Sequence, residues 1–119
     1  MDEDTRNRRR LVAEALTLAA AASTDWDPWA NLALFNAACL REDLTSDDLW
    51  MYLMGRHNPP AEPKRMASVM TSGARLGWIV RTQNFHTSRV PMTHRHGGRA
   101  QRVWKSLIFG TAPAAWPEP

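Results

Sequence analysis

A capping box beginning at Thr45 is the local signal that most limits how this chain can fold. Thr45 is followed three residues later by Asp48, and in such a box each side chain accepts a hydrogen bond from the backbone N–H of the other residue. Leu44 and Leu49 flank the box and can pack together as a hydrophobic staple. The pattern predicts a short helix over residues 46–54 with a sharply defined start.

Further start and stop signals divide the rest of the chain into helices and strands. Asp4 or Thr5 can cap a first helix, and Asp27-Pro28 is typical of a second helix start, because proline lacks an amide hydrogen that the first turn would leave unpaired. Gly77 offers a left-handed helix end, and the β-branched and aromatic residues after it favour a strand. The sequence therefore predicts helices over residues 5–22, 28–41, 46–54 and 62–76, strands over residues 78–82 and 100–107, and a long polar loop over residues 83–99.

Length and composition indicate a single small domain. The chain has 119 residues, of which 44% are hydrophobic, enough for a core that needs no disulfides. Its single cysteine, Cys39, excludes an internal disulfide framework and a multi-cysteine zinc site, and its apolar neighbours predict a buried, reduced thiol. We expect a mainly α domain with a small β-hairpin, organised as an N-terminal helical extension over residues 1–24, a domain over 25–107 and a loose Pro-rich tail over 108–119.

The longest apolar run gives no sign of a membrane segment. It covers residues 11–22, contains Glu14 and is too short to cross a bilayer. The acidic start of the chain, Asp2-Glu3-Asp4, argues against a secretory signal. We therefore expect a soluble, cytoplasmic protein.

Basic residues are concentrated in one part of the chain. Residues 61–106 contain nine lysines and arginines and a single acidic residue, Glu62. Helical spacing in the helix over 62–76 puts an apolar set on one side: Met66, Val69, Met70 and Gly73. The opposite side carries basic and hydroxyl groups: Lys64, Ser68, Thr71, Ser72 and Arg75, with Arg65 at its edge. A face without an acidic side chain favours a polyanionic partner.

The order of the predicted elements resembles that of winged helix-turn-helix proteins, such as the small regulators of bacteria and phages. The resemblance spans about residues 28–106. It rests on two local patterns, Thr45-Ser46-Asp47-Asp48-Leu49-Trp50 at the start of the second helix of the motif and Leu76-Gly77-Trp78-Ile79 at the end of the third. The resemblance implies a winged helix-turn-helix with an extra N-terminal helix, whose recognition helix, 62–76, enters a major groove while a basic wing, 83–99, contacts the backbone or the minor groove.

This resemblance leads us to expect double-stranded DNA binding, with or without sequence specificity, by a transcriptional regulator or an accessory factor of a phage or mobile element. The side chains expected to contact phosphates or base edges are Lys64, Arg65, Ser68, Ser72 and Arg75 on the helix and Arg89, His94, Arg95 and Arg99 on the wing. The arginines near the first helix start, Arg6 and Arg8–Arg10, lie at the unfavourable end of the helix dipole. They fit either a solvated helix end or an arm that touches phosphate.

A rival hypothesis is a winged-helix module that binds a host or replisome protein. Its contacts would come from the N-terminal helix or from the tail with Trp116, and a homodimer is also possible. Trp26 and Trp116 fall in predicted breaks, where they either fill gaps or form a partner surface. Four other tryptophans, Trp29, Trp50, Trp78 and Trp104, are expected in the core.

Catalytic and metal sites are weakly indicated. His86, His94 and His96 would need at least one more ligand, and no Asp, Glu or Cys lies between residues 63 and 117. The acidic group around residues 42–48 is explained by capping and by the helix dipole rather than by a nuclease site. We therefore expect a non-enzymatic protein without a cofactor or a metal.

Overall fold

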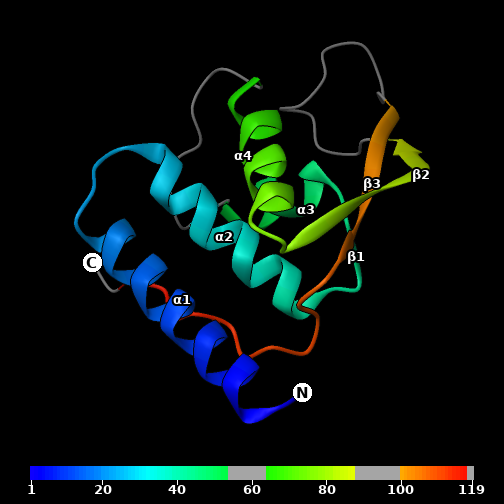
Figure 1. The fold of residues 1–119 in the computed structure, drawn as a ribbon. Coiled ribbons are helices and arrows are strands. Elements are labelled where there is room, and N and C mark those ends of the chain that lie inside the picture. The colour runs from blue at the N-terminus through cyan, green and yellow to red at the C-terminus, as the bar shows by residue number, and fades with distance from the viewer. Residues whose placement is uncertain (54–63, 88–99, 118–119) are drawn as a thin grey trace.

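The computed structural model describes residues 1–53, 64–87 and 100–117. These residues fold into four helices and a small antiparallel sheet (Figure 1), which confirms the expected mainly α architecture with a β-hairpin. The elements in chain order are α1 (Glu3–Ala21), α2 (Trp26–Leu40), β1 (Asp43–Leu44), α3 (Ser46–Leu53), α4 (Lys64–Arg75), β2 (Ile79–Thr87) and β3 (Ala100–Ser106). No helix within the described ranges is long and apolar enough to span a membrane.

The first two helices begin earlier than the sequence predicts. The carboxylate of Asp2 accepts a 2.7 Å bond from the backbone N–H of Thr5, so α1 begins at Glu3, earlier than a cap at Asp4 or Thr5 would give. That bond lowers the pKa of Asp2. Helix α2 begins at Trp26, before the predicted start at Pro28. Pro28 is then the third helical residue. Proline is tolerated there because the amide hydrogen that it lacks would have no partner in the first turn of a helix.

The capping box before α3 forms in part. The carboxylate of Asp48 accepts a 2.7 Å hydrogen bond from the Thr45 backbone N–H, as predicted. The N–H of Asp48 instead donates to the backbone oxygen of Thr45, at 3.1 Å. Leu44 and Leu49 on either side of the box are both buried. The predicted start of the third helix at Ser46 is confirmed.

Helix α2 is the centre of the core. Its residues 32–39 are all buried, and it lies between α1 on one side and α3 and α4 on the other (Figure 1). Helix α4 approaches α2 closely at Gly73, where a Cβ atom would collide with the side chain of Leu34. The Phe35 ring packs edge-on against Trp78, with ring centroids 5.3 Å apart. Gly77 has a φ of 83°, which confirms the predicted left-handed end after α4.

The sheet has the strand order β1-β3-β2, and both pairings are antiparallel. The two-residue strand β1 was not predicted, because its residues become a strand only by pairing with β3. Strand β2 extends to Thr87, so the prediction of a loop beginning at residue 83 is wrong. The rest of the predicted loop, residues 88–99, lies outside the described residues.

The segment 107–117, here called the C-terminal strap, passes between α1 and α2 (Figure 1). The side-chain amide of Asn36 in α2 binds both backbone groups of Ala114: its Oδ1 accepts from the N–H at 2.7 Å, and its Nδ2 donates to the carbonyl at 3.0 Å. The Trp116 ring packs against Trp29 and Tyr52, with centroids 5.3 and 5.5 Å away. The prediction of a loose tail is therefore wrong for residues 108–117.

Candidate nucleic-acid interface

Helix α4 has the two faces that its sequence predicted. Met66, Val69 and Met70 are buried, whereas Thr71 and Arg75 are exposed on the opposite side. Packing against α2 and β2 holds the apolar side of the helix. The basic and hydroxyl face is consequently directed to solvent.

The other predicted contact residues are placed unequally. Arg65 is exposed but forms an ion pair with Asp27 at the start of α2, with 3.3 Å between its Nη2 and the carboxylate oxygen. Ser68 is exposed and Ser72 is half-buried. The side chain of Lys64 and all of the residues predicted on the wing, Arg89, His94, Arg95 and Arg99, lie outside what the structure describes.

A groove of about 490 Å³ separates α4 from the β2–β3 hairpin. Four elements contribute polar side chains to its lining: Ser46 of α3, Thr71 of α4, Arg81 of β2, and Gln101 and Arg102 of β3. Trp104 forms part of its apolar lining. The groove thus joins the exposed face of α4 to the hairpin and is open to a ligand that extends over both.

Two arginines on the hairpin lie over aromatic rings. The Arg81 guanidinium carbon is 5.5 Å from the Trp104 ring centroid, and that of Arg102 is 4.8 Å from the centroid of Phe85. Each pair joins residues that are directly opposite across β2 and β3, and Arg102 and Trp104 are two residues apart, so all four share one face of the hairpin. A guanidinium stacked on a ring is held in place and keeps its charge.

A bulge in β2 brings the second pair into register. Three residues separate Arg81 from Phe85 on β2, whereas one separates Trp104 from Arg102 on β3. The hydroxyl of Thr82 donates to the Val103 carbonyl across the bulge. Arg102 also donates a 2.6 Å hydrogen bond to the Thr82 carbonyl, so part of its guanidinium supports the bulge.

The electrostatics of this region are one-sided. No acidic residue lies between positions 63 and 117, so neither α4 nor the hairpin supplies a carboxylate to the groove. Farther away, Asp48 pairs with Arg41 at 3.3 Å, and Asp27 pairs with Arg65. Arg81 and Arg102 form no ion pair among the described residues, so their charges remain available to an anion.

Sequence reasoning did not select Arg81 or Arg102 as contact residues. Both lie in strands that alternate only in part, and the bulge at residues 82–84 decides that Phe85 comes opposite Arg102. The available signal was the presence of basic and aromatic residues in both strands, which identifies stacking partners only when the register is known.

The structure offers no second chemistry at the other predicted groups. His86 is exposed on β2, while His94 and His96 lie outside the described residues; within the described residues no three His, Cys, Asp or Glu side chains gather as metal ligands. Cys39 is buried, as predicted, and burial raises the pKa of its thiol to about 12. Its thiol is therefore protonated at neutral pH and a poor nucleophile.

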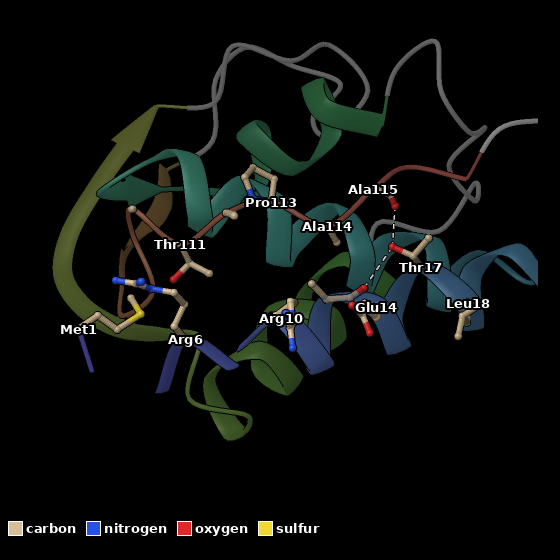
Figure 2. Close-up of a pocket in the computed structure, with 13 residues that line it drawn as sticks. Met1, Arg6, Arg10, Glu14, Thr17, Leu18, Thr111, Pro113, Ala114 and Ala115 are labelled. Atoms are coloured by element: carbon tan, nitrogen blue, oxygen red, sulfur yellow. Dashed lines mark hydrogen bonds between the residues drawn. The ribbon is translucent and has the colours of Figure 1, made fainter. Parts of the chain in front are cut away.

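A larger groove, of about 860 Å³, lies between α1 and the C-terminal strap (Figure 2). Its polar lining has mixed charge, from Arg6, Arg10 and Glu14. The neighbouring Arg9 donates to the Thr111 hydroxyl at 2.7 Å, so this arginine serves to attach the strap to α1. This groove therefore lacks the one-sided positive charge of the groove beside α4.

No protein-family model, no curated protein and no solved structure matches the chain.

Proposed function

We propose that the protein binds double-stranded DNA as a winged helix-turn-helix protein, with α4 as the recognition helix and the β2–β3 hairpin as the base of the wing. The element order α2-β1-α3-α4-β2-β3 supports this proposal, because it is the order in which the winged motif arranges its helices and strands. The sheet order is β1-β3-β2, so β1, the strand that follows α2, pairs with the last strand, β3. This pairing agrees with the same motif.

The observation that carries the proposal is the carboxylate-free groove between α4 and the hairpin. An α-helix fits the major groove of B-DNA, and the phosphates beside that groove are bound by arginine, hydroxyl and backbone donors. The exposed face of α4 and the groove supply such donors from Arg75, Thr71, Arg81 and Arg102. A duplex lying on α4 would bring its backbone against the hairpin arginines.

The proposal assigns different tasks to the two parts of this surface. On α4, Lys64, Ser68 and Arg75 contact base edges or phosphates. On the hairpin, Arg81 and Arg102 contact phosphates and position the duplex, and the predicted wing residues Arg89, His94, Arg95 and Arg99 extend these contacts along the backbone. Such a protein would act in the cytoplasm as a transcriptional regulator or as an accessory factor of a phage or mobile element.

Salt-dependent binding to a random duplex tests the proposal. Fluorescence anisotropy across a salt series should give a linear fall of log K with log salt, as counterions are released. The double variant Arg75→Ala/Arg81→Gln should lower the magnitude of this slope by about 2, one unit for each lost phosphate contact.

Lys105→Gln is the matched control for this experiment. Lys105 is an exposed cation next to Trp104 on β3, so it lies on the opposite face of the same hairpin. Its loss should leave the slope unchanged. If the parent protein does not bind duplex at low salt, or if the control and the double variant weaken binding equally, the proposed interface is wrong.

The rival function is protein docking through the N-terminal helix or through the tail with Trp116, and the contacts of the tail bear on the second route. Trp116 packs between Trp29 and Tyr52, and its neighbour Ala114 is fixed by Asn36, so the tail is part of the fold rather than a free anchor. A complex with a cellular protein that survives high salt and depends on the strap would nevertheless favour that function over DNA binding.

A further inference from the structure

Helix α1 has apolar side chains on two opposite faces. The inner face packs on the core through Ala13 and Ala20, which are buried, and Leu16, which is partly buried. On the outer face Leu11 is 58% exposed and Leu18 is 70% exposed. The outer face of a helix on a monomeric domain normally carries polar groups, so two leucines there require an explanation.

The outer residues follow the repeat of a coiled coil. Leu11, Ala15 and Leu18 of α1 and Ala22, the residue that caps its C-terminal end, are separated by four, three and four positions, and all four are exposed. This spacing is that of the a and d positions of a heptad, with leucine at d and alanine at a. Extending the repeat towards the N-terminus places Arg8, also exposed, at the preceding a position.

We infer that α1 is a dimerisation helix, which packs antiparallel against α1 of a second copy of this chain through Leu11, Ala15, Leu18 and Ala22. In an antiparallel pair a positions face d positions. Each leucine then lies opposite an alanine, Leu11 against Ala22 and Leu18 against Ala15, and large and small side chains alternate across the seam. The same stripe serves both copies, as a two-fold symmetric interface requires.

The distribution of charge along α1 selects the antiparallel orientation. The arginines of α1 all lie in its N-terminal half, and its last turn carries no basic residue. A parallel pair would put Arg8 against Arg8 within the seam, where like charges repel. The antiparallel pair instead brings Arg8 to the C-terminal end of the partner helix, where unpaired carbonyls carry partial negative charge.

A second copy is favoured over an unrelated partner because the stripe complements itself. When a second copy of the stripe is reversed, each of its leucines faces an alanine of the first. The arginine at the N-terminal end of one helix then lies beside the C-terminal end of the other, which carries no cation. This inference is independent of DNA binding, since the outer face of α1 and the groove beside α4 share no residue.

Sedimentation velocity of the DNA-free protein over a concentration series tests the dimer. The parent chain should pass from monomer to dimer as concentration rises. Leu18→Glu should weaken the dimer by at least about tenfold, because each dimer loses two buried leucines. Leu40→Glu is the matched control, since Leu40 is 56% exposed at the end of α2 and lies outside the stripe.

The monomeric fold should be the same in both variants, and far-UV circular dichroism at low concentration checks this, because both leucines are exposed in the single chain. A parent protein that stays monomeric at every concentration would overturn the inference and leave the stripe to a different partner. Equal effects of Leu18→Glu and Leu40→Glu would overturn it as well.

Disulfide trapping tests the orientation. In the antiparallel register, Leu11→Cys in one copy lies opposite Ala22→Cys in the other, whereas two residues 11 are about 16 Å apart along the helix axis. A disulfide requires Cα atoms within about 7 Å. A mixture of the two variants should therefore cross-link, and neither should cross-link alone. The opposite pattern, each variant cross-linking with itself, would exclude the antiparallel pair; buried Cys39 does not interfere.

Discussion

Asn36→Ala should destabilise the protein more than most single substitutions. Asn36 is 1% exposed, and its amide satisfies both backbone polar groups of Ala114, which is itself buried. Alanine would leave this buried N–H and this buried carbonyl without their side-chain partners. A buried polar group that loses its partner costs about 1–3 kcal/mol, so the two together predict a loss of about 2–6 kcal/mol.

Urea unfolding followed by tryptophan fluorescence measures this loss, since six tryptophans report on the fold. Against a typical total stability of about 5–15 kcal/mol, the effect should be plain in the transition midpoint. Asn7→Ala, on the exposed surface of α1, should change the free energy of unfolding by under about 0.5 kcal/mol. If Asn36→Ala costs no more than this control, the strap does not depend on Asn36.

Asn36→Asp separates the two hydrogen bonds of the amide. One carboxylate oxygen can still accept from the Ala114 N–H, but the other would face the Ala114 carbonyl without a proton to donate. Burial should raise the folded-state pKa of such an aspartate above its unfolded value of about 3.9. The variant should then regain stability, relative to the parent, as pH falls through the folded-state pKa. Without that gain, the carboxyl group would not face a carbonyl as the structure places it.

Trp50→Ala should lower the free energy of unfolding by about 3–5 kcal/mol, because Trp50 is buried beside Trp26 and its removal leaves a large cavity. Ser68→Ala changes an exposed residue and should cost under about 0.5 kcal/mol. Thermal melts should therefore show the Trp50 variant to be far less stable than the Ser68 variant. The raised pKa of the Cys39 thiol should make the protein less stable as pH rises. The stability that the buried thiol contributes is complete below its unfolded pKa of 9.0 and is lost as pH rises towards about 12. In urea titrations over this pH range, Cys39→Ala should therefore lose less stability than the parent.

Features that depend only on residues close together in the chain were predicted well from the sequence. The start of α3 depends on a bond between Thr45 and Asp48, three residues apart, and the end of α4 depends on the φ angle of Gly77 alone. The division of α4 into buried and exposed faces follows from its periodicity. Asp2 and Asp4 can both cap the start of α1. Asp2 is the cap in the structure, so the helix begins two residues earlier than predicted.

Features that depend on distant partners were missed. Strand β1 consists of two residues whose strand geometry comes from pairing with Trp104 and Lys105. The strap has no periodic pattern of its own and is held by Asn36, which precedes its partner Ala114 by 78 residues. Arg81 and Arg102 were missed for the same reason, because only the pairing of β2 with β3 brings them onto one face beside Trp104 and Phe85.

The arginines differ in the group that fixes their side chains. This difference predicts how much each one contributes to the affinity for DNA. Arg65 is held by the carboxylate of Asp27, so part of its charge is neutralised and the ion pair must loosen before it binds phosphate. Arg81 is held by the Trp104 ring, which orders the guanidinium without cancelling its charge. Arg81→Gln should therefore weaken duplex binding more than Arg65→Gln in the same salt series, although Arg65 lies on α4 itself. Equal losses would mean that stacking on Trp104 gives Arg81 no advantage in contacting phosphate.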